Sequence, residues 1–174
     1  MTTATRPTPA HPNLVVPDGT RLRPISDADL PFLERVYAST RTEELAQTDW
    51  DDGQKAAFLG FQFRAQHAHY TTHYAGAEFL VIERGGASVG RLYLHWRADD
   101  LRIVDIALLP DARGHGTGES LLRALLDAAT ARGHGVSIHV EQMNPAMRLY
   151  TRLGFRKAGE HGIYHLMEWR PDAQ

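Results

Sequence analysis

The feature that most restricts the fold of this chain is a glycine-rich junction between a strand pattern and a helix pattern. Residues 101–109 are largely apolar, as a central strand would be, and Pro110 ends this run because proline cannot donate to a strand ladder. Alternating glycines follow within residues 113–118, and leucines at helical spacing then continue to about residue 132. A strand that enters a helix through such a loop predicts an α/β domain.

Hydrophobic periodicity assigns the other elements. Strand patterns occupy residues 20–24, 78–83, 88–96, 136–140, 155–160 and 163–169. Helical patterns occupy residues 28–38, 51–73 and 116–132, with shorter pieces that open at Thr40 and Pro145. Ser26 and Thr40 each begin a capping-box pattern, and Asn144 is the expected N-cap before Pro145. We expect one mixed α/β domain over residues 18–174, preceded by a flexible, Thr-, Ala- and Pro-rich tail at residues 1–17.

The composition narrows the function classes. The 174 residues are 43% hydrophobic and 23% charged, which is typical of a soluble globular protein. The absence of cysteine excludes disulfides, thiolate metal sites and a cysteine nucleophile. A net charge of −2 argues against a nucleic-acid partner. Neither a membrane-spanning apolar run nor a secretory signal pattern is present, so we expect a cytoplasmic protein without a membrane partner.

The glycine loop has the chemistry of a phosphate site. Glycines 114, 116 and 118 allow close backbone approach to a ligand, and the first N–H groups of the following helix lack internal partners. The helix dipole favours an anion there, and Arg113 adds a guanidinium suited to phosphate. The Rossmann pattern fails because Leu121 stands where its third glycine is needed, and the P-loop pattern fails because no Gly-Lys-Ser/Thr occurs.

Two sequence blocks together resemble the GNAT family of N-acetyltransferases. The first is the loop, which fits R-x-x-G-x-G and consists of Arg113, Gly114, His115, Gly116, Thr117 and Gly118. The second follows the strand pattern at residues 136–140 and consists of Asn144, Ala146, Leu149, Tyr150, Gly154 and Phe155. The resemblance is specific over residues 103–155 and extends as an order of elements from about residue 20 to residue 169.

The resemblance implies a fold, a cofactor and a mechanism. The fold is a mixed, mostly antiparallel central sheet with flanking helices and a parallel, splayed central strand pair at residues 101–109 and 136–140. The six loop residues would hold the pyrophosphate of acetyl-CoA, the pantetheine arm would pair with the backbone near Ile106 and Leu108, and Asn144 would bind the cofactor further along. An amine would attack the thioester directly, with an N–H near Leu108 stabilising the developing oxyanion.

The resemblance also implies the catalytic residues. Tyr150 would protonate the leaving thiolate, and Asp105 or Glu141 would accept the proton of the amine. Each has an alternative interpretation: Tyr150 as a core residue, Asp105 as a structural hydrogen-bonding partner, Glu141 as a solvated surface acid and Asn144 as a helix cap alone. A metal site could be suggested by three histidines, His67, His69 and His73. No acidic residue lies near them at the spacing of a metal ligand, so we expect no metal.

Two other functions stay open. A non-catalytic domain that binds acyl-CoA as a sensor needs the loop but neither acid nor base. A nucleotide-binding protein could use the same loop, although the failed Rossmann and P-loop tests count against it. The acceptor, a small-molecule or peptide amine, would be selected by residues 41–74 and by the loop at His161-Gly162. A homodimer is common in the family.

Overall fold

A seven-stranded sheet forms the centre of the protein, whose computed structural model describes residues 14–172. The strands lie in the order β1-β2-β3-β4-β5-β7-β6. Their bounds are β1 Thr20–Pro24, β2 Glu78–Arg84, β3 Ala87–Trp96, β4 Asp100–Leu108, β5 Gly135–Glu141, β6 Arg156–His161 and β7 Tyr164–Trp169. Neighbouring strands are antiparallel except β4 and β5, which are parallel. The predicted fold class is confirmed.

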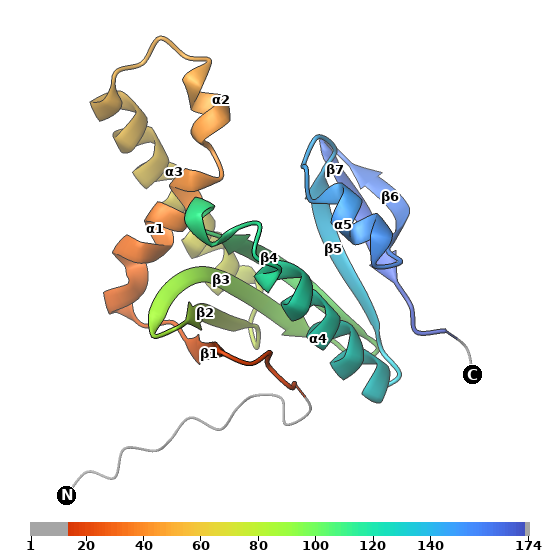
Figure 1. The fold of residues 1–174 in the computed structure, drawn as a ribbon. Coiled ribbons are helices and arrows are strands. Elements are labelled where there is room, and N and C mark those ends of the chain that lie inside the picture. The colour runs from red at the N-terminus through yellow and green to blue at the C-terminus, as the bar shows by residue number, and fades with distance from the viewer. Residues whose placement is uncertain (1–13, 173–174) are drawn as a thin grey trace, which may run out of the picture.

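Helices cover both faces of this sheet (Figure 1). One face carries α1 (Leu30–Ser39) and α3 (Asp52–His73), joined through the short α2 (Thr42–Ala46). The other carries α4 (Thr117–Ala131) and α5 (Met147–Arg152). Short 3₁₀ turns precede α1 and follow β4, at Asp27–Asp29 and Pro110–Ala112. No helix within residues 14–172 is long and apolar enough to cross a membrane.

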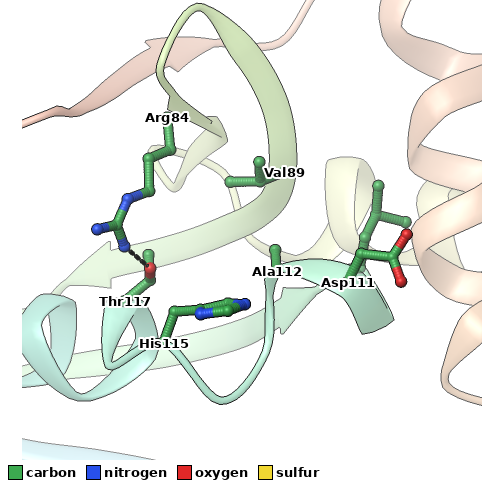
Figure 2. Close-up of a pocket in the computed structure, with 7 residues that line it drawn as sticks. Arg84, Val89, Asp111, Ala112, His115 and Thr117 are labelled. Carbon is green, nitrogen blue, oxygen red and sulfur yellow. Dashed lines mark hydrogen bonds between the residues drawn. The ribbon is translucent and has the colours of Figure 1, made fainter.

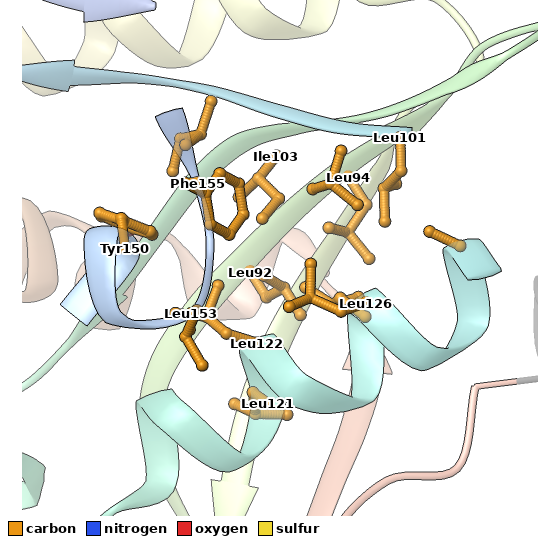
Figure 3. Packing of buried hydrophobic residues seen from close by; sticks show 14 of the residues in the cluster. Leu92, Leu94, Leu101, Ile103, Leu121, Leu122, Leu126, Tyr150, Leu153 and Phe155 are labelled. Carbon is orange, nitrogen blue, oxygen red and sulfur yellow. The ribbon is translucent and has the colours of Figure 1, made fainter. Parts of the chain in front are cut away.

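Alternation along the strands divides the core between the two faces. On β2, Leu80 and Ile82 face α4, whereas Val81 faces α1 and α3. The predicted leucine stripe of α4 packs onto β3 and β4, and residues from α5 and the following segment close the same cluster (Figure 3). This larger cluster fixes α4, and therefore the glycine loop before it, against the ends of the central strands.

The two central strands separate towards their C-terminal ends. The β4–β5 ladder runs from Asp100 opposite Gly135 to Ile103 opposite Ile138 and stops there. At the same point the β3–β4 register shifts, so that Val104 has no partner on β3. A β-bulge of this kind bends its strand. The bulge therefore accounts for the predicted splay, which leaves the last residues of β4 without a strand partner on the β5 side.

Some local predictions differ from the structure. Ser26 begins the predicted capping box, and the Asp29 carboxylate accepts its N–H at 2.8 Å. Thr40 was expected to cap a second helix, but its hydroxyl donates to the Tyr37 carbonyl at 2.7 Å at the end of α1, and α2 begins after Arg41. This prediction was wrong because a threonine hydroxyl can also bond backward to a preceding helical carbonyl.

Two residues of the expected N-terminal tail contact the core. Residues 1–13 are outside the described part of the chain, but Leu14 and Val16, assigned above to the tail, pack against the larger core cluster. The packed part of the chain therefore includes residues before the expected boundary at residue 18.

Candidate active site

A cavity of about 220 Å³ opens where β4 and β5 separate. Residues 104–107 of β4 and 138–141 of β5 form two of its sides, and side chains from α1, α3, α5 and β7 complete it. Three predicted catalytic residues, Tyr150, Asp105 and Glu141, line this one cavity together with Asn144 and Ile106. The predicted site residues of β4, of β5 and of the segment that follows β5 thus meet at the splay.

The backbone of β4 presents polar groups to this opening. Leu109 donates its N–H to the Val89 carbonyl on β3 at 2.8 Å. Backbone groups of successive residues point to opposite sides of an antiparallel strand, so the polar groups of Leu108 and Ile106 point towards β5. The β4–β5 ladder has ended before them, at Ile103. Both residues therefore offer backbone groups where the pantetheine arm and the oxyanion were predicted to bind.

Tyr150 reaches the cavity from α5. Tyr150 is 4% exposed, and its ring lies edge-on to Phe155 with 5.5 Å between the centroids. The ring is therefore packed in the core, as the alternative interpretation of Tyr150 expected. The hydroxyl makes no hydrogen bond to another residue of the described range 14–172. Burial, and secondarily the negative charge of Asp105, raise the pKa of the phenol. The hydroxyl therefore retains its proton at neutral pH, as a general acid must.

The two candidate bases have different surroundings. The Asp105 carboxylate forms an ion pair with the guanidinium of Arg91, whose side chain is 3% exposed. Glu141 has a side chain that is 43% exposed, and one of its oxygens lies 3.8 Å from Arg41. Asp105 is thus held in place by a buried partner, which agrees with the alternative interpretation of Asp105 as a structural residue. Glu141, by contrast, has direct access to water.

The glycine loop has a backbone conformation that favours glycine. Gly114 and Gly116 have φ of 76° and 80°, which disfavours side chains, and a Cβ on either residue would meet nothing within 4 Å. Gly116 is the N-cap of α4, so the first N–H groups of this helix open onto the loop. The loop therefore leaves room for a ligand to approach its backbone.

Arg113 has a position that the sequence did not suggest. Its Nε donates to the Leu108 carbonyl at 2.9 Å, and one terminal nitrogen donates to the Ser39 hydroxyl at 3.3 Å. The side chain therefore ties the loop to the end of β4 and to α1. Its remaining N–H donors are the ones that can serve a phosphate.

A second cavity, of about 420 Å³, borders the loop on the side of β2 and β3 (Figure 2). His115 and Thr117 line it, and Arg84 at the end of β2 donates a hydrogen bond to the Thr117 hydroxyl. The side chains of these two loop residues thus face β2 and β3, away from β5. Their predicted contribution to cofactor binding depends on their backbone.

Asn144 caps a turn instead of the predicted helix start. Its side-chain oxygen accepts the N–H of Ala146 at 2.9 Å, and α5 begins at Met147, two residues beyond the expected first position at Pro145. Asn144 still lines the splay cavity, so the cap and the ligand role remain compatible.

Several cavity residues escaped the sequence analysis. Tyr37 from α1, Gln66 and Tyr70 from α3, and Arg91 from β3 line the same cavity as Asp105. The available signal was Arg91, a charged residue inside an otherwise apolar strand pattern. For the metal interpretation, residues 14–172 contain no group of three or more ligating side chains, although the rings of His69 and His73 lie 4.5 Å apart.

Comparison with known proteins finds similarity to acetyltransferases. Residues 75–157, from just before β2 into β6, match the family model of the acetyltransferase (GNAT) domain. This part of the chain is therefore similar to the GNAT family. Solved N-acetyltransferase structures have the same overall fold. The PaiA N-acetyltransferase of Thermoplasma acidophilum, in complex with coenzyme A, aligns with a TM-score of 0.66 at 16% identity, over 87% of this chain and 99% of that one. The Escherichia coli ribosomal-protein-S18-alanine N-acetyltransferase aligns with a TM-score of 0.58 at 17% identity, over 89% and 96% of the two chains.

Two curated relatives share more sequence with this chain. A Bacillus subtilis protein assigned as a ribosomal protein bS18-alanine N-acetyltransferase is 32% identical over 91 residues, which are 51% of this chain and 60% of that protein. A mycothiol acetyltransferase of Corynebacterium aurimucosum is 36% identical over 97 residues, 49% of this chain and 32% of that protein. The similarity therefore spans less than two thirds of either relative.

Proposed function

We propose that this chain transfers an acetyl group from acetyl-CoA to an amine acceptor, by direct attack of the amine on the thioester. The observation that carries the proposal is the unpaired end of β4. There, the backbone groups of Ile106 and Leu108 point towards β5, and Ile106 lines the same cavity as Tyr150, Asp105 and Glu141. A sensor would need only the backbone and the loop, so the meeting of acid and bases favours catalysis.

The residues of the loop fit coenzyme A. Gly114 and Gly116 have open space where a side chain would be, and the α4 N-terminus faces a loop suited to pyrophosphate. Arg113 would add its remaining donors, and Gly118, His115 and Thr117 their backbone. Asn144 would contact the cofactor from the opposite side of the splay. Acetyl-CoA would supply an acyl group already activated as a thioester.

Each cavity residue then has one task. The Leu108 N–H donates to the carbonyl oxygen as negative charge develops there, when the amine nitrogen bonds to the carbonyl carbon. Tyr150 gives its proton to the sulfur as the carbon–sulfur bond breaks. The proton that the amine loses passes to Asp105 or to Glu141, directly or through water. The products are an amide and free coenzyme A.

The acceptor is proposed to be an amine on a small molecule or a peptide. Residues of α1 and α3 line the cavity, and they would select the acceptor together with the β6–β7 turn at His161-Gly162. The assigned names of the Bacillus subtilis relative and of the Escherichia coli structure both state an alanine acceptor on a ribosomal protein, so a peptide with N-terminal alanine is a first acceptor to test. A cytoplasmic location and a homodimer remain predictions.

The test is an acceptor screen with acetyl-CoA that follows thiol release. Gly116→Val serves as the loop variant because a side chain there would occupy the space of the pyrophosphate. Gly76→Val is its matched control: Gly76 has φ of 83°, also has open space at its Cβ position and lies at the turn between α3 and β2.

Both variants carry similar backbone strain, so both should lose similar stability. Acetyl-CoA should raise the melting temperature of the wild type and of Gly76→Val, but not that of Gly116→Val. An equal shift in all three proteins contradicts the loop assignment. Tight coenzyme A binding without turnover of any amine favours the sensor.

A further inference from the structure

Arg91 is a buried cation within the sheet. It lies on β3, and its side chain points towards α1 and α3, where one terminal nitrogen donates to the Gln66 side-chain oxygen at 3.0 Å. Its guanidinium carbon lies 6.0 Å from the ring centre of Tyr37 and 5.1 Å from that of Tyr93. Burial of a guanidinium is costly unless it is paired, and its acidic partner is Asp105 on the adjacent strand.

This ion pair extends from the interior to the cavity. Arg91 is closed off from water, whereas the Asp105 side chain is 20% exposed and lines the cavity. Oδ2 of Asp105 is shielded from solvent and faces Arg91, which leaves Oδ1 for a ligand. Replacement of a buried ion pair by apolar residues often leaves stability unchanged or higher, so stability alone explains this pair poorly. A role of Asp105 in the cavity explains this ion pair better.

We propose that Arg91 is a positioning residue that holds Asp105 as an ionised carboxylate with one oxygen in the cavity, and that this oxygen binds the acceptor as a primary ammonium ion. The inference rests on the proposed acetyl transfer and deepens it by naming the charge state in which the acceptor is recognised.

The surroundings of Asp105 agree with this assignment. Tyr70 and Tyr150 both face Asp105, and burial raises the pKa of each phenol. Both phenols are therefore neutral, and neither competes with Asp105 as a negative group for an ammonium ion. The phenol rings of Tyr37 and Tyr70 border the same space and can lie against a cation. Asp105 and Glu141 are therefore the negative groups of the cavity, and Asp105 is the one that a buried partner holds still.

Steady-state kinetics with the best acceptor of the screen test the role of Arg91. Arg91→Met and Asp105→Asn should each raise the KM for the acceptor about 10- to 100-fold, the worth of a hydrogen bond to a charged group. The double variant should be no worse than Asp105→Asn alone, because Arg91 acts through Asp105. Arg91→Lys should recover part of the loss. The Kd for acetyl-CoA, measured by calorimetry, should stay unchanged in all of them.

The matched control is Arg97→Met. Arg97 follows the end of β3 and pairs with Asp100 at the start of β4, at the opposite end from the splay, so its loss removes an Arg–Asp ion pair, here with a 44% exposed arginine, without touching the cavity. Its acceptor KM should equal that of the wild type. If Arg91→Met does not fold, Gln66→Leu removes the hydrogen bond to Arg91 and should raise the same KM in a folded protein.

A binding experiment reads the charge of the acceptor independently of turnover. The ammonium acceptor and its hydroxyl isostere are titrated into the complex with coenzyme A. The ammonium should bind more tightly to the wild type than to Asp105→Asn, and the isostere equally to both.

Independent, additive effects of Arg91→Met and Asp105→Asn, or equal ammonium binding to both proteins, overturn the inference. A wild type that acetylates no amine overturns the proposed function instead.

Discussion

The Tyr150→Phe substitution separates the catalytic role of this residue from its packing role. The ring is 4% exposed and lies against Phe155, and phenylalanine keeps both features. The hydroxyl has no hydrogen-bonding partner among residues 14–172, so its loss should change the free energy of unfolding by less than about 1 kcal/mol. Loss of a positioned acid should lower kcat by about 10²–10⁴-fold, or roughly 3–5 kcal/mol of transition-state stabilisation.

The assay is thiol release at saturating acetyl-CoA and acceptor, with thermal unfolding of the same samples. The effect should appear in kcat more than in KM, because the thiolate charge develops only in the transition state. Tyr74→Phe, at the end of α3 and outside the cavity, is the control and should keep the wild-type kcat. A wild-type kcat in Tyr150→Phe, under conditions where chemistry is rate-limiting, would refute the assignment.

Three further substitutions test the fold around the site. In Gly90→Ala, the new Cβ would overlap the Ala107 carbonyl on β4, so stability to denaturant should fall by about 1–3 kcal/mol. Leu125→Ala empties a side-chain position that is 0% exposed and should lower the free energy of unfolding in urea by about 2–5 kcal/mol. Asp29→Asn should destabilise the protein at pH 7, because Arg23 holds the pKa of that carboxyl below its usual range. A carboxyl whose pKa is lowered by folding stabilises the fold at pH values above its pKa in the unfolded chain, and this stabilisation is lost as pH falls. The difference in melting temperature between the wild type and Asp29→Asn should therefore shrink below about pH 4.

The sequence predicted the parts of the site that depend on local chemistry. Gly114 and Gly116 were assigned to a loop whose backbone a ligand can approach, and in the structure both have open space where a Cβ would lie. The α4 leucine stripe was predicted from its period, and it packs as expected because one helical face meets one face of the sheet. These features follow from a few adjacent residues, which a single sequence displays directly.

Features that depend on distant residues were missed. The pairing of Arg91 with Gln66 and Asp105 joins β3, α3 and β4, and no spacing along the chain indicates it. Arg113 was interpreted by charge alone, and its bond to the Leu108 carbonyl follows from the path of the loop back over the strand end. Charge and hydrogen-bonding capacity can be read from a sequence, but the choice among several available partners requires the fold.

The position of Asp105 illustrates this limit most clearly. Strict alternation along β4 would place Asp105 on the same face as Leu101 and Ile103, in the apolar core under α4. The bulge at Val104 adds one residue and reverses the alternation, so that Asp105 instead faces α1 and α3 beside Arg91. The same bulge bends β4 where its ladder with β5 ends. One inserted residue therefore opens the cavity and also delivers the carboxylate into it, which makes the two features a single consequence of the strand geometry.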